Sequence, residues 1–133
     1  MILEITKDNI NELENSFINI NDMRNEFESN PFAKVLVLKE NNEIIGYIYY
    51  SDIYERAEIN QFEINFIHRN CGKGDFLLKK MIEAVEKDIT LEVKEDNYPA
   101  ISLYQKNNFI KKAIRKGYYN GIDGILMERI NNK

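Results

Sequence analysis

Three apolar segments rich in β-branched residues follow one another between residues 34 and 66, and an amphipathic helical pattern comes directly after them. The segments span residues 34–39, 44–50 and 57–66. Residues 40–43 (ENNE) separate the first two and predict a tight turn, so these strands should form a hairpin. In the third segment the apolar positions change phase between Ile59 and Phe62, which predicts a β-bulge. We therefore expect an antiparallel meander in the middle of the chain.

The second half of the chain alternates between helical and strand patterns. Apolar residues at positions 77, 78, 81, 82 and 85 recur with helical spacing. Residues 89–93 are then typical of a strand, 99–106 of a helix, and 109–113 and 125–130 of two more strands. A strand, a helix and a strand in succession form a parallel unit. The expected fold class is therefore α/β (α+β), with a mixed, mostly antiparallel sheet and helices on both faces.

The N-terminal region is expected to begin with a short edge strand at residues 1–6. Apolar residues at near-helical spacing predict a helix over residues 7–23, and a second short helix is expected over residues 22–28. The pair Asn30-Pro31 should end it, because the residue before proline avoids the helical conformation.

Length and composition exclude several classes of protein. The 133 residues suit a single domain covering 1–133. The net charge is −4, with 18 basic against 22 acidic residues, which disfavours nucleic-acid binding. The one cysteine, Cys71, and the one histidine, His68, permit no disulfide and no metal centre of the usual Cys/His kind. No apolar run approaches the roughly 20 residues of a membrane span, and no signal peptide is recognisable, so we expect a cytoplasmic protein that is a monomer or a homodimer.

Between the last strand of the meander and the amphipathic helix lies the loop Arg69-Asn70-Cys71-Gly72-Lys73-Gly74. Glycines in such a loop permit positive φ and a close approach of the backbone to a ligand. Backbone N–H groups at a helix N-terminus bind anionic phosphates. The spacing fits neither a P-loop nor a dinucleotide-binding fingerprint, and alone the pattern is also that of a plain turn.

The rest of the C-terminal half resembles the GNAT acetyltransferases, and among them the ribosomal-protein-alanine (RimI-type) N-acetyltransferases. Arg69, Gly72 and Gly74 match that family's Arg/Gln-x-x-Gly-x-Gly/Ala loop. Residues 58–65 resemble its bulged fourth strand, and residues 115–119 its paired-tyrosine element. The remaining matches, in order, are Leu91-Glu92-Val93, Asn97, Ala100-Ile101-x-Leu103-Tyr104 and Phe109.

The resemblance implies acetyl-CoA as the cofactor and a sheet that splays between its fourth and fifth strands. Backbone groups of Phe62 and Ile64, freed by the bulge and the splay, would hold the pantetheine arm. The phosphates would lie at the loop and the first turn of the following helix, in contact with Arg69, Asn70, Cys71, Gly72, Lys73, Gly74 and Asp75. The sequence departs from the family at Lys73, which replaces an apolar residue, at Phe66, which replaces a proline, and at Asp75, whose charge would repel a pyrophosphate.

The resemblance also suggests catalytic roles for two residues. Glu92 would be the general base for the substrate amine, with Glu63 on the fourth strand as the alternative base or a substrate contact. Tyr104 would protonate the departing thiolate and contact the cofactor, since a phenol with an ordinary pKa near 10 is a suitable donor. Simple packing and a solvated strand position are the competing explanations for these side chains. Cys71 is not expected to be a nucleophile.

Three further residues are expected near the ligands. Asn97 should cap the helix that contains Pro99 and, by resemblance, contact the cofactor as well. Tyr118 and Tyr119 would line the groove for a peptide N-terminus, although packing explains them equally well. Asn108 is expected in the left-handed conformation after the Tyr104 helix, where relatives have glycine.

The function expected from the resemblance is transfer of acetyl from acetyl-CoA to a primary amine by direct attack in a ternary complex, with a protein N-terminus as acceptor. Two alternatives remain open. One is acetylation of a small-molecule amine such as a polyamine, an amino acid or an aminoglycoside, because a fold alone does not fix the acceptor. The other is a non-catalytic acyl-CoA-binding module.

Overall fold

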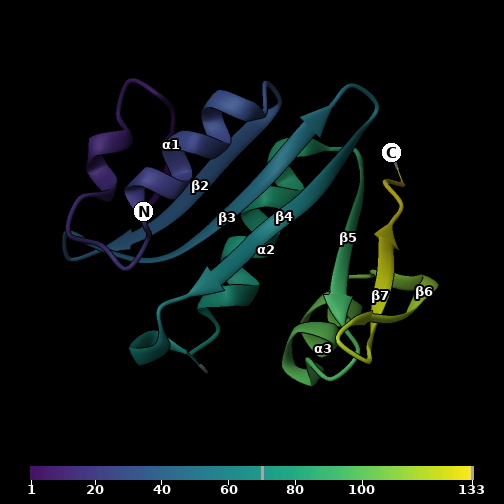
Figure 1. Ribbon diagram of the computed structural model, residues 1–133. Helices are drawn as coiled ribbons and strands as arrows, with labels where there is room; N and C mark the ends of the chain where they lie inside the picture. The colour runs from purple at the N-terminus through teal and green to yellow at the C-terminus, as the bar shows by residue number, and fades with distance from the viewer. Residues whose placement is uncertain (70, 133) are drawn as a thin grey trace.

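The computed structural model describes residues 1–69 and 71–132, and a single seven-stranded sheet organises them (Figure 1). The strand order is β1-β2-β3-β4-β5-β7-β6. The strands are β1 (Ile2–Ile5), β2 (Ala33–Glu40), β3 (Glu43–Ile53), β4 (Arg56–Ile64), β5 (Asp88–Lys94), β6 (Ile110–Tyr119) and β7 (Ile122–Arg129). The helices are α1 (Ile20–Ser29), α2 (Lys73–Val85) and α3 (Tyr98–Lys106), with short 3-10 helices η1 (Ile10–Leu13) and η2 (Phe66–His68).

The predicted meander is confirmed. β2, β3 and β4 pair antiparallel in sequence, and Asn41 and Asn42 form the two-residue turn with φ of 52° and 62°. Two positive φ values match the right-handed twist of a hairpin. The predicted bulge is also present, because Tyr50 pairs with Ile59 but Tyr49 pairs with Gln61, which leaves Asn60 as the extra residue. β4 ends two residues earlier than expected, and Phe66 lies in η2.

The predicted splay lies between β4 and β5. These parallel strands pair only from Arg56↔Asp88 to Glu58↔Thr90. Beyond that point each strand continues, β4 to Ile64 and β5 to Lys94, while the two diverge (Figure 1). The edges of β4 and β5 that face each other here therefore have no strand partner.

Helices cover both faces of the sheet, as predicted. α2 and α3 pack on one face through a cluster that includes Leu77, Leu78, Met81, Ile101 and Tyr104. η1 and α1 pack on the other face through a second cluster that includes Ile10, Leu13, Ile18 and Met23. No helix in the described part of the chain is long and apolar enough to cross a bilayer.

The prediction of a helix over residues 7–23 is wrong. Only η1 forms there, and α1 starts at Ile20 after Asn19, whose side chain accepts a hydrogen bond from the Asp22 N–H. Asn15 takes φ of 63°, and the Ser16 hydroxyl bonds the Leu13 carbonyl and the Ile18 N–H. Side chains of this kind offer the backbone local bonds that compete with a helix.

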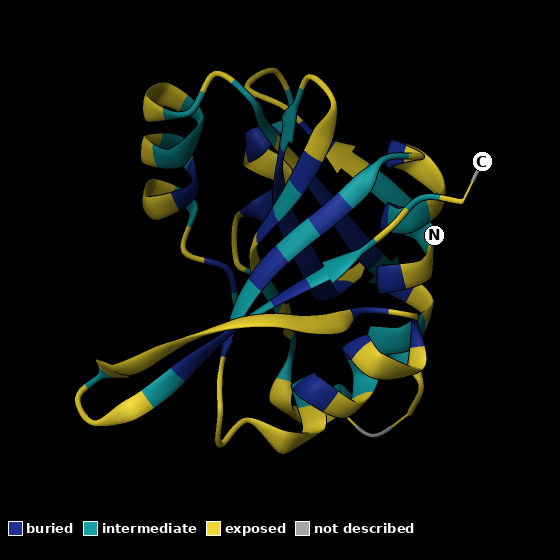
Figure 2. Cartoon of the chain, turned by 90° about the vertical axis from the view of Figure 1, so that its right-hand side faces the viewer, coloured by how far each residue is buried: buried dark blue, intermediate teal, exposed yellow. Residues whose placement is uncertain are grey.

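The C-terminal hairpin is longer than expected. The sequence predicts strands over 109–113 and 125–130, whereas β6 spans ten residues and β7 begins at Ile122. β6 is the edge strand and is almost entirely exposed, and the hairpin extends away from the body of the molecule (Figure 2). The missed half of β6 contains Gly117 between charged residues and two adjacent tyrosines, so its apolar residues do not alternate as in a regular strand.

Candidate active site

The backbone of β4 beside the splay is the first part of the site. Phe62 and Ile64 point their side chains toward the α2–α3 cluster, so what they offer at the splay is main-chain N–H and C=O groups. The Ile64 carbonyl accepts a hydrogen bond from Arg69 Nε at 2.9 Å. A ligand using that carbonyl would have to displace Arg69 or share the oxygen with it.

The loop before α2 has the backbone geometry expected of an anion site. Gly72 lies at the N-cap with φ of 76°, and no side chain among the described residues caps the helix. The first intrahelical bond is from the Phe76 N–H to the Gly72 carbonyl. Helix geometry leaves the N–H groups of residues 73–75 without an intrahelical partner. Cys71 is exposed, and Asn70 falls outside the residues that the structure describes.

Each charged side chain around this loop has an opposite charge beside it. Lys73 Nζ lies 2.8 Å from Glu40 Oε2, and the ammonium holds the pKa of Glu40 below its usual range. Arg69 lies 3.4 Å from Glu63. Asp75 pairs with Lys79 at 2.6 Å and accepts from the Asn107 amide at 2.9 Å, and these bonds lower its pKa. The repulsion expected from Asp75 is therefore largely offset by its own partners.

Glu92 is the carboxylate on β5 beside the splay. Its neighbours Leu91 and Val93 belong to the α2–α3 cluster, so Glu92 faces the opposite side of the sheet. Tyr119 donates its hydroxyl to Oε1 at 3.1 Å, and Arg115 Nε lies 2.9 Å from Oε2 in an ion pair that lacks hydrogen-bond alignment. A Cβ on Gly124 would lie 3.0 Å from Oε2 and 3.0 Å from the Tyr119 ring. A side chain at this position would therefore require the carboxylate or the ring to shift by a few tenths of an ångström.

Tyr104 lies on α3, on the other face of the sheet. Its ring packs against Phe62 at 6.3 Å and Phe109 at 5.4 Å between centroids. Burial raises the pKa of Tyr104 to about 12. The phenol therefore stays protonated at physiological pH and acts as a hydrogen-bond donor.

The expected caps of α3 are confirmed. The Asn97 side chain accepts from the Ala100 N–H at 3.3 Å, with Pro99 in the first turn. Asn108 follows the helix with φ of 72°, in the left-handed conformation. These contacts fix the start and the end of the helix that positions Tyr104.

The ionisation of the tyrosines should show which of their side chains are buried. Burial raises the pKa of Tyr47, Tyr50 and Tyr104 to about 12 each, whereas an unfolded tyrosine titrates near 10. As the pH rises, the unfolded chain therefore loses these protons at a lower pH than the folded chain does. The stability that they contribute is complete below about pH 10 and is lost as the pH rises toward 12. We expect near-ultraviolet absorbance to show one group of tyrosinates near pH 10 and a second that appears only with loss of the folded circular dichroism signal. A single transition near pH 10 in a protein that stays folded would contradict this.

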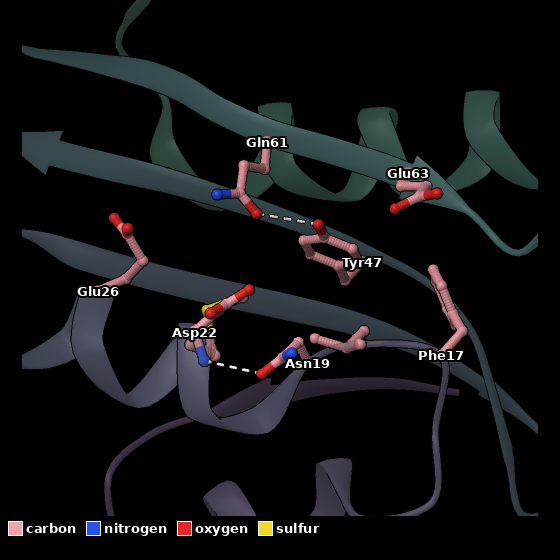
Figure 3. Close-up of a pocket in the computed structure, with 9 residues that line it drawn as sticks. Phe17, Asn19, Asp22, Glu26, Tyr47, Gln61 and Glu63 are labelled. Carbon is pink, nitrogen blue, oxygen red and sulfur yellow. Dashed lines mark hydrogen bonds between the residues drawn. The ribbon is translucent and has the colours of Figure 1, made fainter.

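A pocket of about 230 Å³ lies between α1 and the strands on the Glu92 face (Figure 3). Asp22 and Glu26 reach it from α1, and Tyr47, Gln61 and Glu63 from β3 and β4. The Tyr47 hydroxyl donates to the Gln61 side chain at 2.9 Å. The complete lining is Phe17, Ile18, Asn19, Asp22, Met23, Glu26, Tyr47, Gln61 and Glu63. These described residues include three carboxylates and no lysine or arginine.

The fold brings the predicted residues to two sides of the splay. Glu63 and Glu92 lie on one face of the sheet, where Tyr119 is hydrogen-bonded to Glu92. Tyr104 and the loop before α2 lie toward the other face of the sheet. Tyr118 does not contact Glu92 in any described bond; it is 56% exposed, meets the Tyr119 ring edge to face and lies beneath the Arg115 guanidinium. In the sequence, Arg115 lies within the segment that resembles the paired-tyrosine element, but no role of its own was predicted for its side chain.

The acidic wall formed by Asp22 and Glu26 was also missed. The two residues lie four apart on α1, which is a detectable spacing. The helix predicted over residues 22–28 already places the two one turn apart, but the sequence does not show that this face of the helix borders a pocket.

A splayed mixed sheet, with a glycine loop at a helix N-terminus on one side and a carboxylate on the other, defines a class of acyl-transfer fold. Residues 4–109 match the model of the acetyltransferase (GNAT) family. The chain belongs to this family.

Individual relatives agree with this assignment. A Bacillus subtilis protein provisionally named a ribosomal protein bS18-alanine N-acetyltransferase is 33% identical over 77% of this chain and 72% of its own length. The Haemophilus influenzae ribosomal protein bS18-alanine N-acetyltransferase is 39% identical over 63% of this chain and 60% of its own length.

Solved structures show the same fold. The crystal structure of the Escherichia coli ribosomal-protein-S18-alanine N-acetyltransferase aligns with a TM-score of 0.84 and 19% identity, over 100% of this chain and 94% of that one. A GNAT family acetyltransferase from Elizabethkingia anophelis with acetyl-CoA bound aligns with a TM-score of 0.77 and 20% identity, over 98% of this chain and 97% of that one.

Proposed function

We propose that this chain transfers acetyl from acetyl-CoA to a primary amine, namely the α-amine of a protein N-terminus, by direct attack in a ternary complex. The observation that carries the proposal is the splay. It exposes unpaired β4 backbone next to the α2 N-terminus and places Glu92 on the opposite face. The names of the bS18-alanine N-acetyltransferases support the choice of acceptor.

The residues present fit the cofactor. The free N–H groups at the start of α2 suit a pyrophosphate, and the β4 main chain at Phe62 and Ile64 suits the amides of a pantetheine arm. Gly74 lies on the inner side of α2, beside Leu103, Ile64 and Phe62, which brings the start of the helix next to the β4 main chain. The outer contacts would come from Arg69 to Asp75 and from Asn97. When bound, acetyl-CoA supplies an activated thioester.

Glu92 would act on the amine and Tyr104 on the departing thiolate, and the second proton released from the amine nitrogen would pass to the thiolate or to solvent. An amine attacks only in its neutral form, so Glu92 would take a proton from the arriving ammonium, directly or through water. Tyr104 would donate a hydrogen bond to the departing sulfur. Its raised pKa of about 12 makes it a stabilising donor more readily than a full proton source. Glu63 is the alternative base, although its contact with Arg69 competes for that role.

The pocket between α1 and β4 would receive the acceptor chain. It lies on the same face of the sheet as Glu92, since Gln61 and Glu63 pair with Tyr49 and Tyr47 of the α1-side cluster. Its three carboxylates, Asp22, Glu26 and Glu63, also favour a second candidate acceptor, a polyamine.

The cofactor half of the proposal is tested by ligand linkage. Acetyl-CoA at 100 times its Kd should stabilise the fold by about 2.7 kcal/mol, which is a rise in Tm of several degrees. Thiol release should then be measured with a peptide that has a free α-amine, with the same peptide blocked at its N-terminus, and with spermidine. We expect release with the free peptide and none with the blocked one. A Tm that does not change at high acetyl-CoA concentration would contradict the proposal. Turnover with spermidine but not with the free peptide would show that the acceptor is a polyamine.

A further inference from the structure

The last four residues of β6 do not follow a regular strand. Arg115 pairs with Gly124 and Tyr119 with Ile122. Three residues of β6 therefore oppose the single residue Asp123 of β7, where a regular ladder would have one opposite one. The extra length forms a loop within the hairpin.

Glycine and a carboxylate hold this loop in place. Gly117 takes φ of 61°, a conformation that favours glycine. Its N–H donates to Asp123 Oδ1 at 2.8 Å, and its carbonyl accepts from the Gly121 N–H at 3.2 Å. Lys116 lies 3.5 Å from the other Asp123 oxygen. The bond from Gly117 is the largest cause of the lowered pKa of Asp123.

The loop has a direct consequence for Glu92. Residues four apart on a regular strand are separated by roughly 13 Å along its axis. Arg115 and Tyr119 nevertheless both reach the one carboxylate, at 2.9 Å and 3.1 Å. The irregular segment shortens the path between them enough for both side chains to converge on Glu92.

We propose that Arg115 is a positioning residue, which with Tyr119 fixes the Glu92 carboxylate at the splay. The inference rests on the proposed function, because it assigns Arg115 a role only through Glu92. Tyr119 donates a hydrogen bond to Oε1 and Arg115 forms an ion pair with Oε2, while a Cβ at Gly124 would lie 3.0 Å from Oε2. The Arg115 guanidinium also lies over the Tyr118 ring, 4.6 Å from its centroid, which gives it a second contact besides Glu92.

A kinetic double-mutant cycle tests this. Arg115→Gln should lower kcat/KM for the acceptor about 10- to 100-fold, the scale of loss when a reacting group is misplaced by about 1 Å. Acetyl-CoA binding should be unchanged. In a Glu92→Gln background the same substitution should change kcat/KM by less than about twofold, because its partner has already been removed. Arg115→Lys should restore part of the rate, since it keeps the charge but not the planar fork.

The control is Lys112→Gln, which removes a β6 cation whose partner is Glu128, at 3.8 Å, and not Glu92. It should leave kcat/KM within about twofold of the unaltered chain. If Arg115→Gln and Glu92→Gln lower the rate multiplicatively, Arg115 acts independently of Glu92 and the inference is overturned. If Glu92→Gln has no measurable turnover, methylguanidinium should restore activity to Arg115→Ala, and a failure to do so also overturns it. An unaltered chain without transferase activity overturns the proposed function itself, and the inference with it.

Discussion

Glu92→Gln should lower kcat for acetyl transfer by about 100- to 10,000-fold, the range that general acid–base groups contribute. The amide keeps the size of the carboxylate and can still accept from Tyr119, but it cannot take a proton from the acceptor. The loss should appear in kcat more than in the apparent affinity for acetyl-CoA, because Glu92 faces away from the α2–α3 side of the sheet. Steady-state kinetics together with a thermal shift in acetyl-CoA measures both quantities.

Glu128→Gln is the matched control for this substitution. Glu128 also lies in the C-terminal part of the sheet and pairs with a β6 cation, Lys112, at 3.8 Å. It should leave kcat within about twofold of the unaltered chain. Normal turnover by the Glu92→Gln protein would show that Glu92 is not the general base, and Glu63 would be the next residue to replace.

Phe109→Ala should cause the largest loss of stability among single substitutions near the site. The ring is 1% exposed and packs against Tyr104 at 5.4 Å. Truncating a buried phenylalanine costs about 3–5 kcal/mol, because apolar contacts are lost and a cavity remains. For a domain of this size that is a fall in Tm of roughly 10–20 °C.

Ile110→Ala, one position further along, controls for the Phe109 substitution. Its side chain is 54% exposed, so truncation should change stability by no more than about 0.5 kcal/mol. Thermal and urea unfolding of the two variants gives the comparison. Equal losses for the two would mean that the Tyr104–Phe109 packing is not part of the core.

The parts of the fold that were predictable from the sequence are those fixed by local chemistry. Asn41-Asn42 specifies its hairpin, the phase slip after Ile59 gives the bulge at Asn60, and Asn97 with Pro99 starts α3. The prediction of a helix over residues 7–23 was wrong for the opposite reason. Its apolar spacing was helical, but local bonds from Ser16 and the left-handed Asn15 decided the backbone.

The candidate site was only partly predictable. Glu92 and Tyr104 came from the resemblance, and their roles remain proposals. Arg115 and Tyr119 converge on Glu92 because three residues of β6 lie opposite a single residue of β7. A periodic pattern of apolar residues does not reveal such an irregularity. The acidic pocket depends on how α1 packs across β3 and β4, a tertiary contact between residues about 20 to 40 positions apart in the chain.

The central claim is that this chain acetylates an amine with acetyl-CoA at the splay. It is tested most directly by incubating the protein with acetyl-CoA and a peptide that carries both a free α-amine and an internal lysine. Mass spectrometry of the fragments then locates the acetyl group. We expect acetylation of the α-amine that depends on acetyl-CoA and is lost in Glu92→Gln. A folded protein that binds acetyl-CoA yet leaves the peptide and polyamines unmodified would contradict the claim and identify the chain as an acyl-CoA-binding module.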